Sequence, residues 1–281
     1  MSAEARPADD AAVLLTLSPS KTLAGPDAPP LPAGAAPTLP RHLDRSERLV
    51  RRLRKFDEEE LAHVLGVSAK LAALNVARFR DWSLPLTGAN SAPAVRAFRG
   101  DVYDGLAADA WTAEDLAFAQ RRLRILSGLY GTLRPLDRVA AYRLEMGTRF
   151  PTHSPRNPRT LYEFWGDRLA RTLRDDLDAL GGAPVLLDLA SREYAKAAPL
   201  PGVRTVAPRF LEERDDGPPR VVALFAKRAR GALANWVLTN RVTDPDRLPE
   251  FDALGYRFAE DLSEPDAPAF TRRSAGVRRR P

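Results

Sequence analysis

The chain contains no cysteine among its 281 residues. This absence excludes disulfides, thiolate nucleophiles, iron–sulfur ligation and redox sensing by thiols. Histidine is also scarce, with three residues. Glu60 and His63 have the i, i+3 spacing of di-iron carboxylate bundles, but such bundles need the motif twice and the sequence has a single copy. We therefore expect neither a metal site nor a cofactor.

Long apolar runs are missing as well, since none approaches the roughly 20 residues of a membrane span. The first residues are acidic where a secretion signal needs positive charge. The sequence thus predicts a cytoplasmic protein without membrane contact. Basic charge is abundant, because 43 Lys and Arg against 37 Asp and Glu give a net charge of +6. A basic protein attracts polyanions such as nucleic acid, although arginine-rich composition is also typical of GC-rich genomes.

Composition divides the chain into a lead-in, one folded region and a tail. Residues 1–11 predict a flexible lead-in, and residues 264–281 predict a basic, disordered tail. Residues 12–263 between them predict a single α/β domain, with a Pro-rich loop at 24–40. A hydrophobic content of 44% over this length is enough for a substantial core.

Apolar periodicity predicts the main elements of this domain. Helical spacing of apolar residues occurs in four segments: 44–55, 57–66, 68–80 and 161–180. Short continuous apolar runs, which predict buried strands, occur in three: 13–17, 185–190 and 221–226. No internal repeat of fixed period is present. No G-x-S-x-G motif of a Ser-His-Asp hydrolase occurs either.

The stretch LSGLYGTLRPLD, residues 126–137, predicts a helix, a tight glycine hairpin and a further element. The helix would begin at the cap residue Thr112 and end at Gly128, in the C′ position. Gly131 permits a second turn. Such a hairpin can point backbone N–H groups at a phosphate, with Arg134 beside it. The alternative is a purely structural turn.

A lysine follows each of the three apolar runs. Lys21 lies in SPSK, Lys196 in SREYAK and Lys227 in KRARG. Because ligands bind beyond the carboxyl ends of strands in α/β sheets, these lysines can converge on one anionic group. The alternative is that exposed strand ends carry solvated basic residues. The full set of phosphate-binding candidates is Ser18, Ser20, Lys21, Asn75, Arg78, Arg124, Gly128, Gly131, Arg134, Arg143, Ser191, Lys196, Lys227, Arg228 and Arg230.

Eight segments in order closely resemble the YaaA family of bacterial peroxide-stress proteins: LSPSKT, KLAALNVARF, FRGDVYDGL, LSGLYGTLRPLD, AYRLEMG, LYEFWGD, LDLASREYAK and FAKRARG. The resemblance runs from about Leu14 to Asp261. It implies a mixed α/β (α+β) single domain, a small sheet surrounded by helices, with a helix-hairpin-helix element at residues 126–137. It also implies sequence-tolerant DNA binding through a basic cleft and a role in limiting intracellular iron during peroxide stress. Asp188 stands where the family pattern has Asn, and Arg228 where it has Lys.

An enzyme is the alternative to a DNA-binding module. The lysines and their polar neighbours form a larger set than backbone binding requires. A desolvated lysine can act as a base or as a Schiff-base nucleophile on a nucleobase, a nucleotide or damaged DNA. The catalytic candidates are Lys21, Lys196, Lys227, Tyr103, Tyr142, Glu145 and Glu193. The sequence leaves the oligomeric state open.

Overall fold

A computed structural model describes residues 11–151 and 158–273 of the chain. The predicted flexible lead-in, apart from residue 11, lies outside the described residues, as does the end of the predicted tail at 274–281. Within the described ranges, no helix combines the length and the apolar composition needed to cross a membrane. A single hydrophobic cluster of buried residues extends from Ala12 to Phe270.

A five-stranded sheet in the order β6-β5-β1-β8-β9 forms the centre of the fold. Its members are β1 (Ala12–Leu17), β5 (Leu123–Ser127), β6 (Gly131–Leu133), β8 (Pro184–Asp188) and β9 (Arg204–Val206). The central strand β1 pairs in parallel with β5 and β8, β8 pairs in parallel with β9, and β6 is antiparallel. All of β1 is buried, which explains its continuous apolar run. The strands predicted at 13–17 and 185–190 are confirmed.

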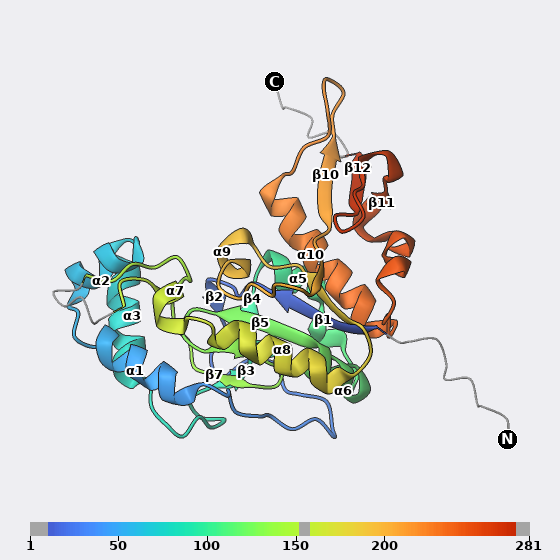
Figure 1. Cartoon of the computed structure of the whole chain (residues 1–281). Helices are drawn as coiled ribbons and strands as arrows, with labels where there is room; N and C mark the ends of the chain where they lie inside the picture. The colour runs from blue at the N-terminus through green and yellow to red at the C-terminus, as the bar shows by residue number, and fades with distance from the viewer. Residues whose placement is uncertain (1–10, 152–157, 274–281) are drawn as a thin grey trace, which may run out of the picture.

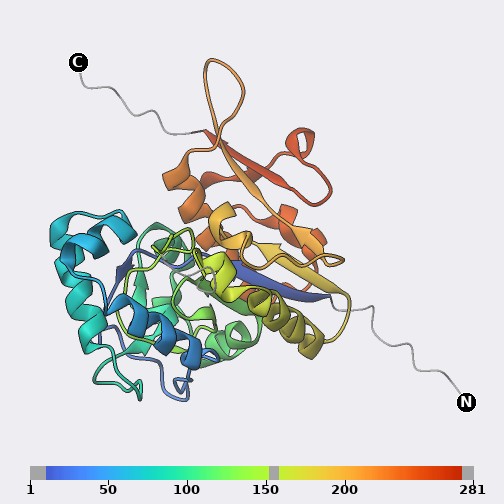
Figure 2. The same cartoon turned by 60° about the vertical axis from the view of Figure 1, so that its left-hand side comes forward.

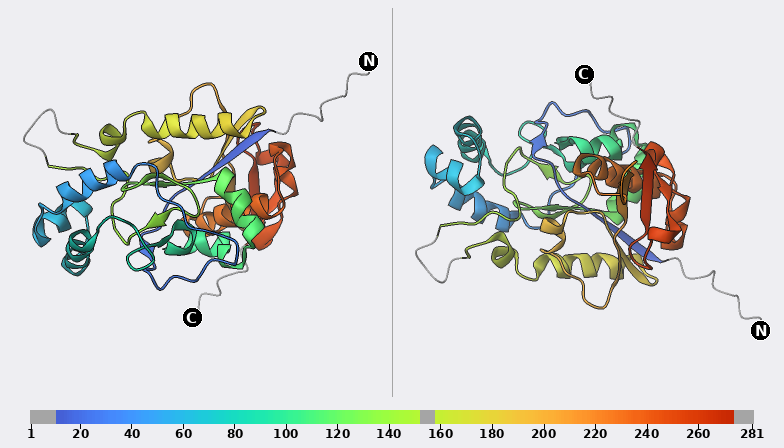
Figure 3. Two further views of the ribbon diagram at one scale, coloured as in Figure 1. Left: turned by 90° about the horizontal axis from the view of Figure 1, so that it is seen from below. Right: turned by 90° about the horizontal axis from the view of Figure 1, so that it is seen from above.

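Helices cover both faces of this sheet. Figure 3 shows α8 (Arg168–Leu180) on one face, and α6 (Ala113–Arg122) and α10 (Ala223–Thr239) on the other. The helix predicted at 161–180 is present as two helices, α7 (Leu161–Trp165) and α8, because the helical conformation is interrupted at Gly166.

A group of three helices lies beside the sheet, in blue and cyan in Figures 1 and 2. These are α1 (Leu43–Leu53), α2 (Glu58–Leu65) and α3 (Ala69–Asp81), and all three predicted helices are confirmed to within two residues. Asp57 begins α2 with a capping box, and Gly66 ends it in the left-handed conformation. A tight turn then leads directly into α3. The chain therefore contains a helical hairpin, at 58–81.

Residues 126–137 do not form the predicted helical hairpin. Helix α6 ends at Arg122, and the chain continues as β5, which turns through Gly128 and pairs antiparallel with β6 from Gly131 onward. The helical spacing that suggested a longer helix is coincidental, because every residue of β5 is buried beside β1. Tertiary pairing with the central strand overrides the local periodicity.

Two further predictions are wrong. The apolar run 221–226 is not a strand, because α10 begins at Ala223 and its buried residues continue at helical spacing beyond the run. The tail is not disordered over 264–273. There β12 (Ala269–Arg273) pairs with β10 (Arg209–Glu213) and β11 (Arg257–Phe258). Ala269 and Phe270 of β12 are buried and hold the strand in the core, although the segment is rich in Pro and Arg overall.

The remaining elements are short. They are β2 (Thr22–Leu23), β3 (Ala92–Pro93), α4 (Ala94–Ala97), β4 (Phe98–Arg99), α5 (Asp101–Leu106), β7 (Arg138–Val139), α9 (Arg192–Ala195) and 3-10 turns at 108–110, 245–250, 253–255 and 260–262. The Pro-rich segment 24–40 is a loop apart from one isolated bridge, at Thr38.

Candidate anion-binding cavity

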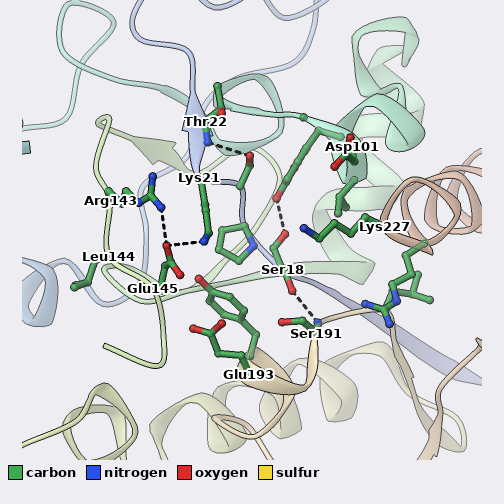
Figure 4. A pocket seen from close by; sticks show the side chains of 18 of the residues that line it. Ser18, Lys21, Thr22, Asp101, Arg143, Leu144, Glu145, Ser191, Glu193 and Lys227 are labelled. Carbon is green, nitrogen blue, oxygen red and sulfur yellow. Dashed lines mark hydrogen bonds and ion pairs between the residues drawn. The ribbon is translucent and has the colours of Figure 1, made fainter. Parts of the chain in front are cut away.

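A cavity of about 460 Å³ lies beyond the carboxyl ends of β1 and β8. Five segments line it: 18–22 after β1, 100–103 at the start of α5, 142–145, 189–194 after β8, and Lys227 with Arg230 in α10. Their side chains point into one space in Figure 4. This is the position at which α/β sheets bind ligands, because loops leave neighbouring strands there in different directions.

The structure gathers eleven of the sequence candidates around this cavity. They are Ser18, Ser20, Lys21, Tyr103, Tyr142, Arg143, Glu145, Ser191, Glu193, Lys227 and Arg230. Asp101 and Tyr194 line the cavity as well. They lie in the motifs FRGDVYDGL and LDLASREYAK, and this membership is their signal in the sequence.

Ser18 connects the three elements at the base of the cavity. Its hydroxyl oxygen accepts a hydrogen bond from the backbone N–H of Ser191 at 2.8 Å. Its carbonyl oxygen accepts one from the Tyr103 hydroxyl at 3.0 Å. The end of β1 is therefore tied to the loop after β8 and to α5, and this fixes the relative positions of the cavity walls.

The carboxylates on one wall already have partners. One oxygen of Glu145 lies 3.0 Å from Lys21 Nζ and 3.1 Å from an Arg143 guanidinium nitrogen. Glu193 accepts a hydrogen bond from the backbone N–H of Gly147 at 2.7 Å. Lys21 remains 64% exposed in this pair. These carboxylates are therefore engaged before any ligand arrives.

The opposite wall carries cations without such partners. Among the described residues, the Lys227 side chain has no ion pair or hydrogen bond, and the Arg230 guanidinium makes no hydrogen bond. Burial lowers the pKa of Arg230, while attraction to Asp188 opposes that change and repulsion by Arg192 adds to it. The Asp188 Oδ1 atom accepts hydrogen bonds from the Thr16 hydroxyl and from the Ala190 N–H. No ion pair joins this carboxylate to the Arg230 guanidinium within the described residues. This wall is cationic and available to an anion.

Two glycines bring α10 against α5 so that this wall faces the cavity. A Cβ at Gly105 would lie 2.0 Å from the Arg228 carbonyl oxygen, and one at Gly231 would lie 1.8 Å from the Val102 carbonyl oxygen. Real Cβ atoms do not approach a backbone oxygen so closely, so only glycine allows this crossing. The sequence signal was a glycine inside each helix without a turn to explain it.

The tyrosines form a neutral floor. Tyr103 and Tyr142 are buried, and the Tyr142 hydroxyl lies 2.6 Å from the Ser127 hydroxyl. Burial raises the pKa of both phenols well above 10, and for Tyr142 this outweighs the opposing effect of the hydrogen bond between the Ser127 and Tyr142 hydroxyls. Both remain protonated near neutral pH, so they offer ring surface and hydroxyl groups, and not phenolate bases.

Comparison with known proteins now identifies the family. The family model described as peroxide stress protein YaaA matches residues 13–262. The chain belongs to the YaaA family. A UPF0246 protein of Cupriavidus metallidurans is 44% identical over 265 residues, covering 93% of this chain and 99% of the relative. A UPF0246 protein of Dechloromonas aromatica is 43% identical over 265 residues, covering 94% and 100%. The resemblance drawn from the sequence is thus confirmed.

The YaaA family match includes all five segments of the cavity, whereas β12 lies beyond it. Within residues 11–151 and 158–273 of this YaaA-family chain, no group of three or more His, Asp or Glu side chains is arranged to hold a metal ion. Glu60 and His63, which have metal-ligand spacing, both lie in α2, away from the cavity.

Several candidates of this YaaA-family chain have structural roles elsewhere. Arg124 is 3% exposed, and its Nε lies 2.6 Å from an Asp176 carboxylate oxygen. Arg134 pairs with the fully buried Asp137 at 2.8 Å. Asn75 is buried in α3 and donates to the Leu71 carbonyl. Each of the three donates a hydrogen bond within the protein and none lines the cavity, although the buried Asn75 Oδ1 atom has no hydrogen-bond partner among the described residues.

The hairpin glycines are buried in the core. A Cβ at Gly128 would lie 2.3 Å from the Leu144 carbonyl oxygen. Gly131 has a φ of +75°, and a Cβ there would lie 3.0 Å from the Trp165 ring. The Trp165 indole also donates to the Gly128 carbonyl at 3.0 Å. The burial of both glycines favours the structural alternative over phosphate binding by this hairpin.

The other three candidates lie outside the cavity lining. Lys196 Nζ lies 4.9 Å from the centre of the Tyr162 ring. Arg228 is exposed on α10, one residue beyond Lys227. Arg78 is half-buried in α3, where burial lowers its pKa. The three lysines consequently do not converge, since only Lys21 and Lys227 line the cavity.

Proposed function

We propose that this YaaA-family chain is a cytoplasmic peroxide-stress protein that binds DNA through phosphate groups and helps limit iron-driven oxidative DNA damage. The family match supports the role in peroxide stress. The net charge of +6 supports attraction to a polyanion. The effect on iron-driven damage is indirect in this proposal, through DNA that the protein covers.

The observation that carries the proposal is the unpaired cationic wall of α10. Lys227 and Arg230 face the cavity without a carboxylate bonded to either, while Glu145 on the opposite wall is neutralised by two cations. Within the described residues, an anion entering the cavity meets two cations that no carboxylate bonds, although Asp188 attracts Arg230 and Asp101 also lines the cavity. Phosphates bound in this way give affinity with little sequence preference.

The helical hairpin formed by α2 and α3 adds a second contact to the proposal. Its turn is exposed, and Ser68, at the N-cap of α3, makes no side-chain capping hydrogen bond. Lys70 is exposed in the first turn of α3. Free backbone N–H groups beside a lysine suit a phosphate of the DNA backbone.

An enzyme remains the second candidate, because the cavity has the volume of a small-ligand site. Lys21 is paired with Glu145 and Lys196 lies over Tyr162, so Lys227 is the amine that would form a Schiff base. Borohydride trapping with abasic-site DNA, followed by mass spectrometry, separates the candidates. We expect no adduct. A stoichiometric adduct on Lys227 that disappears in Lys227→Arg would establish the enzyme instead.

Salt-dependent binding tests the DNA proposal. Fluorescence anisotropy with unrelated duplexes should give similar affinities that fall steeply with salt, because phosphate contacts release counterions. Lys227→Ala should lower the salt slope by about one unit, whereas Lys227→Arg keeps the charge and the slope. Absence of duplex binding at low salt would refute the proposal.

A further inference from the structure

A second cationic site lies in a groove of about 640 Å³ between α1 and the corner that joins α7 to α8. Four arginines line it: Arg45, Arg48, Arg52 and Arg168. The groove shares no lining residue with the cavity at the strand ends. It is therefore a separate feature of the surface, and neither the family match nor the proposed cavity site accounts for it.

Three of these arginines form a stripe along α1. Arg45, Arg48 and Arg52 follow the i, i+3, i+7 spacing that places residues on one helical face. The stripe extends over about 10 Å at 1.5 Å per residue. Arg52 donates to the backbone carbonyls of Pro151 and Pro158 and so is fixed in place, yet it keeps its positive charge. A stripe of this length suits more than one phosphate group.

The carboxylates beside the groove are already engaged. Glu163 accepts a hydrogen bond from the Arg159 N–H at 2.8 Å. Asp167 pairs with Arg171 at 2.7 Å, and the α1 carboxylate Glu47 pairs with Arg51 at 3.8 Å. The acids of this region thus have other partners, and the groove retains excess positive charge.

Two of the groove arginines have no partner among the described residues. Neither the Arg48 guanidinium nor the Arg168 guanidinium makes a hydrogen bond or an ion pair there. Burial lowers the pKa of Arg45, and repulsion from Arg168 and Arg48 lowers it further. Arg45 forms a long ion pair of 4.0 Å with Asp44, which is 76% exposed and opposes part of this lowering. Arg48 and Arg168 add like charge beside it, and no carboxylate among the described residues bonds either guanidinium. A bound anion would stabilise such a group of like charges.

Helix α7 separates the groove from the cavity. The Arg45 guanidinium lies 5.6 Å from the Phe164 ring centre on one side of α7. On the other side, the Tyr162 hydroxyl donates to the carbonyl of Glu193, a cavity residue, at 3.0 Å. Figures 1 and 2 both show α7 between α1 and α9. The two cationic sites therefore flank one short helix.

We propose that the groove is a second phosphate-binding site, which holds successive phosphates of a nucleic acid strand while the cavity wall holds another part of the same DNA. This inference rests on the proposed DNA binding and adds a site to it. The ligand class is a phosphodiester polyanion, because the cations are spread along α1 and do not surround a single point.

The test removes the unpaired arginines and compares them with paired ones. The double variant Arg48→Ala/Arg168→Ala should lower the salt slope of duplex binding by about two units, since each lost phosphate contact removes about one. The matched control is Arg51→Ala/Arg171→Ala, which removes the same charge from the same two helices but from arginines that pair with Glu47 and Asp167. We expect its slope to fall by less than half as much. Arg48→Lys/Arg168→Lys should restore the slope of the wild type.

The outcomes separate the two proposals. Equal slopes for the wild type and the Arg48→Ala/Arg168→Ala variant, with Lys227→Ala still lowering the slope, would overturn the groove alone. An equal fall in the test and control variants would also overturn it, because general charge would then explain the loss. A wild type that binds no duplex at low salt would overturn both proposals. Circular dichroism melting of each variant confirms that the folded protein is compared.

Discussion

Two arginine-containing regions of this molecule differ in what their charges meet. The buried Arg124 and the partly exposed Arg41 both bind the buried Asp176, with contacts of 2.6 and 2.7 Å. At the cavity, Arg230 is partly buried and makes no hydrogen bond to a carboxylate within the described residues. A buried charge is costly unless it is paired. The charges of the first region therefore stabilise the fold, whereas the charge of Arg230 is available to a ligand.

The comparison shows that residue type does not identify a binding residue. Arg124 and Arg230 both lie in or beside segments that resemble the YaaA family, and both were phosphate candidates. Only the partner distinguishes them, because Asp176 comes from α8, a helix more than 50 positions away from Arg124 in the sequence. Five predictions test this distinction, in order from the largest expected effect to the smallest.

Asp176→Asn should lower the free energy of unfolding by about 3–5 kcal/mol, because it leaves the buried Arg124 without its countercharge and also removes the ion pair of the partly exposed Arg41. Urea denaturation measures this loss. The control is Asp167→Asn, which breaks an exposed pair and should change stability by less than about 1 kcal/mol. DNA affinity of folded Asp176→Asn should stay at the wild-type value. A loss of affinity without a loss of stability would contradict the assignment of this region to the fold.

The same pair predicts a pH dependence. Burial raises the pKa of Asp176, but the hydrogen bonds and charges of Arg124 and Arg41 outweigh it and lower the pKa below its ordinary value. The carboxylate therefore stabilises the fold above the unfolded pKa of about 4, and this stabilisation is lost as pH falls through the lower folded pKa. In Asp176→Asn, the free energy of unfolding should no longer contain this loss as the pH is lowered, which urea denaturation at several pH values would measure.

Gly131→Val should lower stability by about 2–4 kcal/mol, from the left-handed backbone and the clash with the Trp165 ring. Gly202→Val is the matched control, because Gly202 also has a positive φ, of +80°, but has no atom within 4 Å of an added Cβ. It should cost about 1–2 kcal/mol, the backbone part alone. Thermal melting of both variants measures the difference. Equal losses would show that core packing does not explain Gly131.

Lys227→Ala/Arg230→Ala should weaken duplex binding about tenfold at low salt and lower the salt slope by about two units. Stability should change little, since neither side chain bonds to a carboxylate. Lys196→Ala is the control, because Lys196 lies outside the cavity lining and should leave affinity unchanged. Fluorescence anisotropy titrations at several salt concentrations measure the affinity and the salt slope of each variant. Equal effects of the two variants would remove the distinction between cavity and surface.

Asp188→Asn should have the smallest effect, a slight rise in melting temperature at neutral pH. Burial raises the pKa of Asp188, and the Thr16 and Ala190 hydrogen bonds with the Arg230 charge offset only part of that rise. A raised folded pKa means that the ionised carboxylate costs stability at neutral pH, and that this cost disappears as pH falls through the folded pKa. The advantage of the variant should therefore vanish in acid. A variant less stable than the wild type at pH 7 would contradict this sign.

Much of the fold could be predicted because its signals are local. The run at 13–17 and the run at 185–190 are buried strands, and α2 begins at the capping box of Asp57. The helix predicted through residues 123–127 is wrong, since their apolar spacing suits a helix and a strand equally. Pairing with β1 decides between the two, and that pairing is a contact between distant segments. The strand β12 was missed for the same reason.

Residue order alone predicts the family, the buried strands β1 and β8, and the motifs that surround the cavity, because each of these depends on neighbours within a few positions. Which cations remain free depends on contacts between distant segments. The tertiary structure paired Lys21 with Glu145, buried Arg124 against Asp176, and left Lys227 unpaired on a helix that two glycines press against α5. Charge in a protein is compensated across space, and the sequence does not record which distant carboxylate lies within reach.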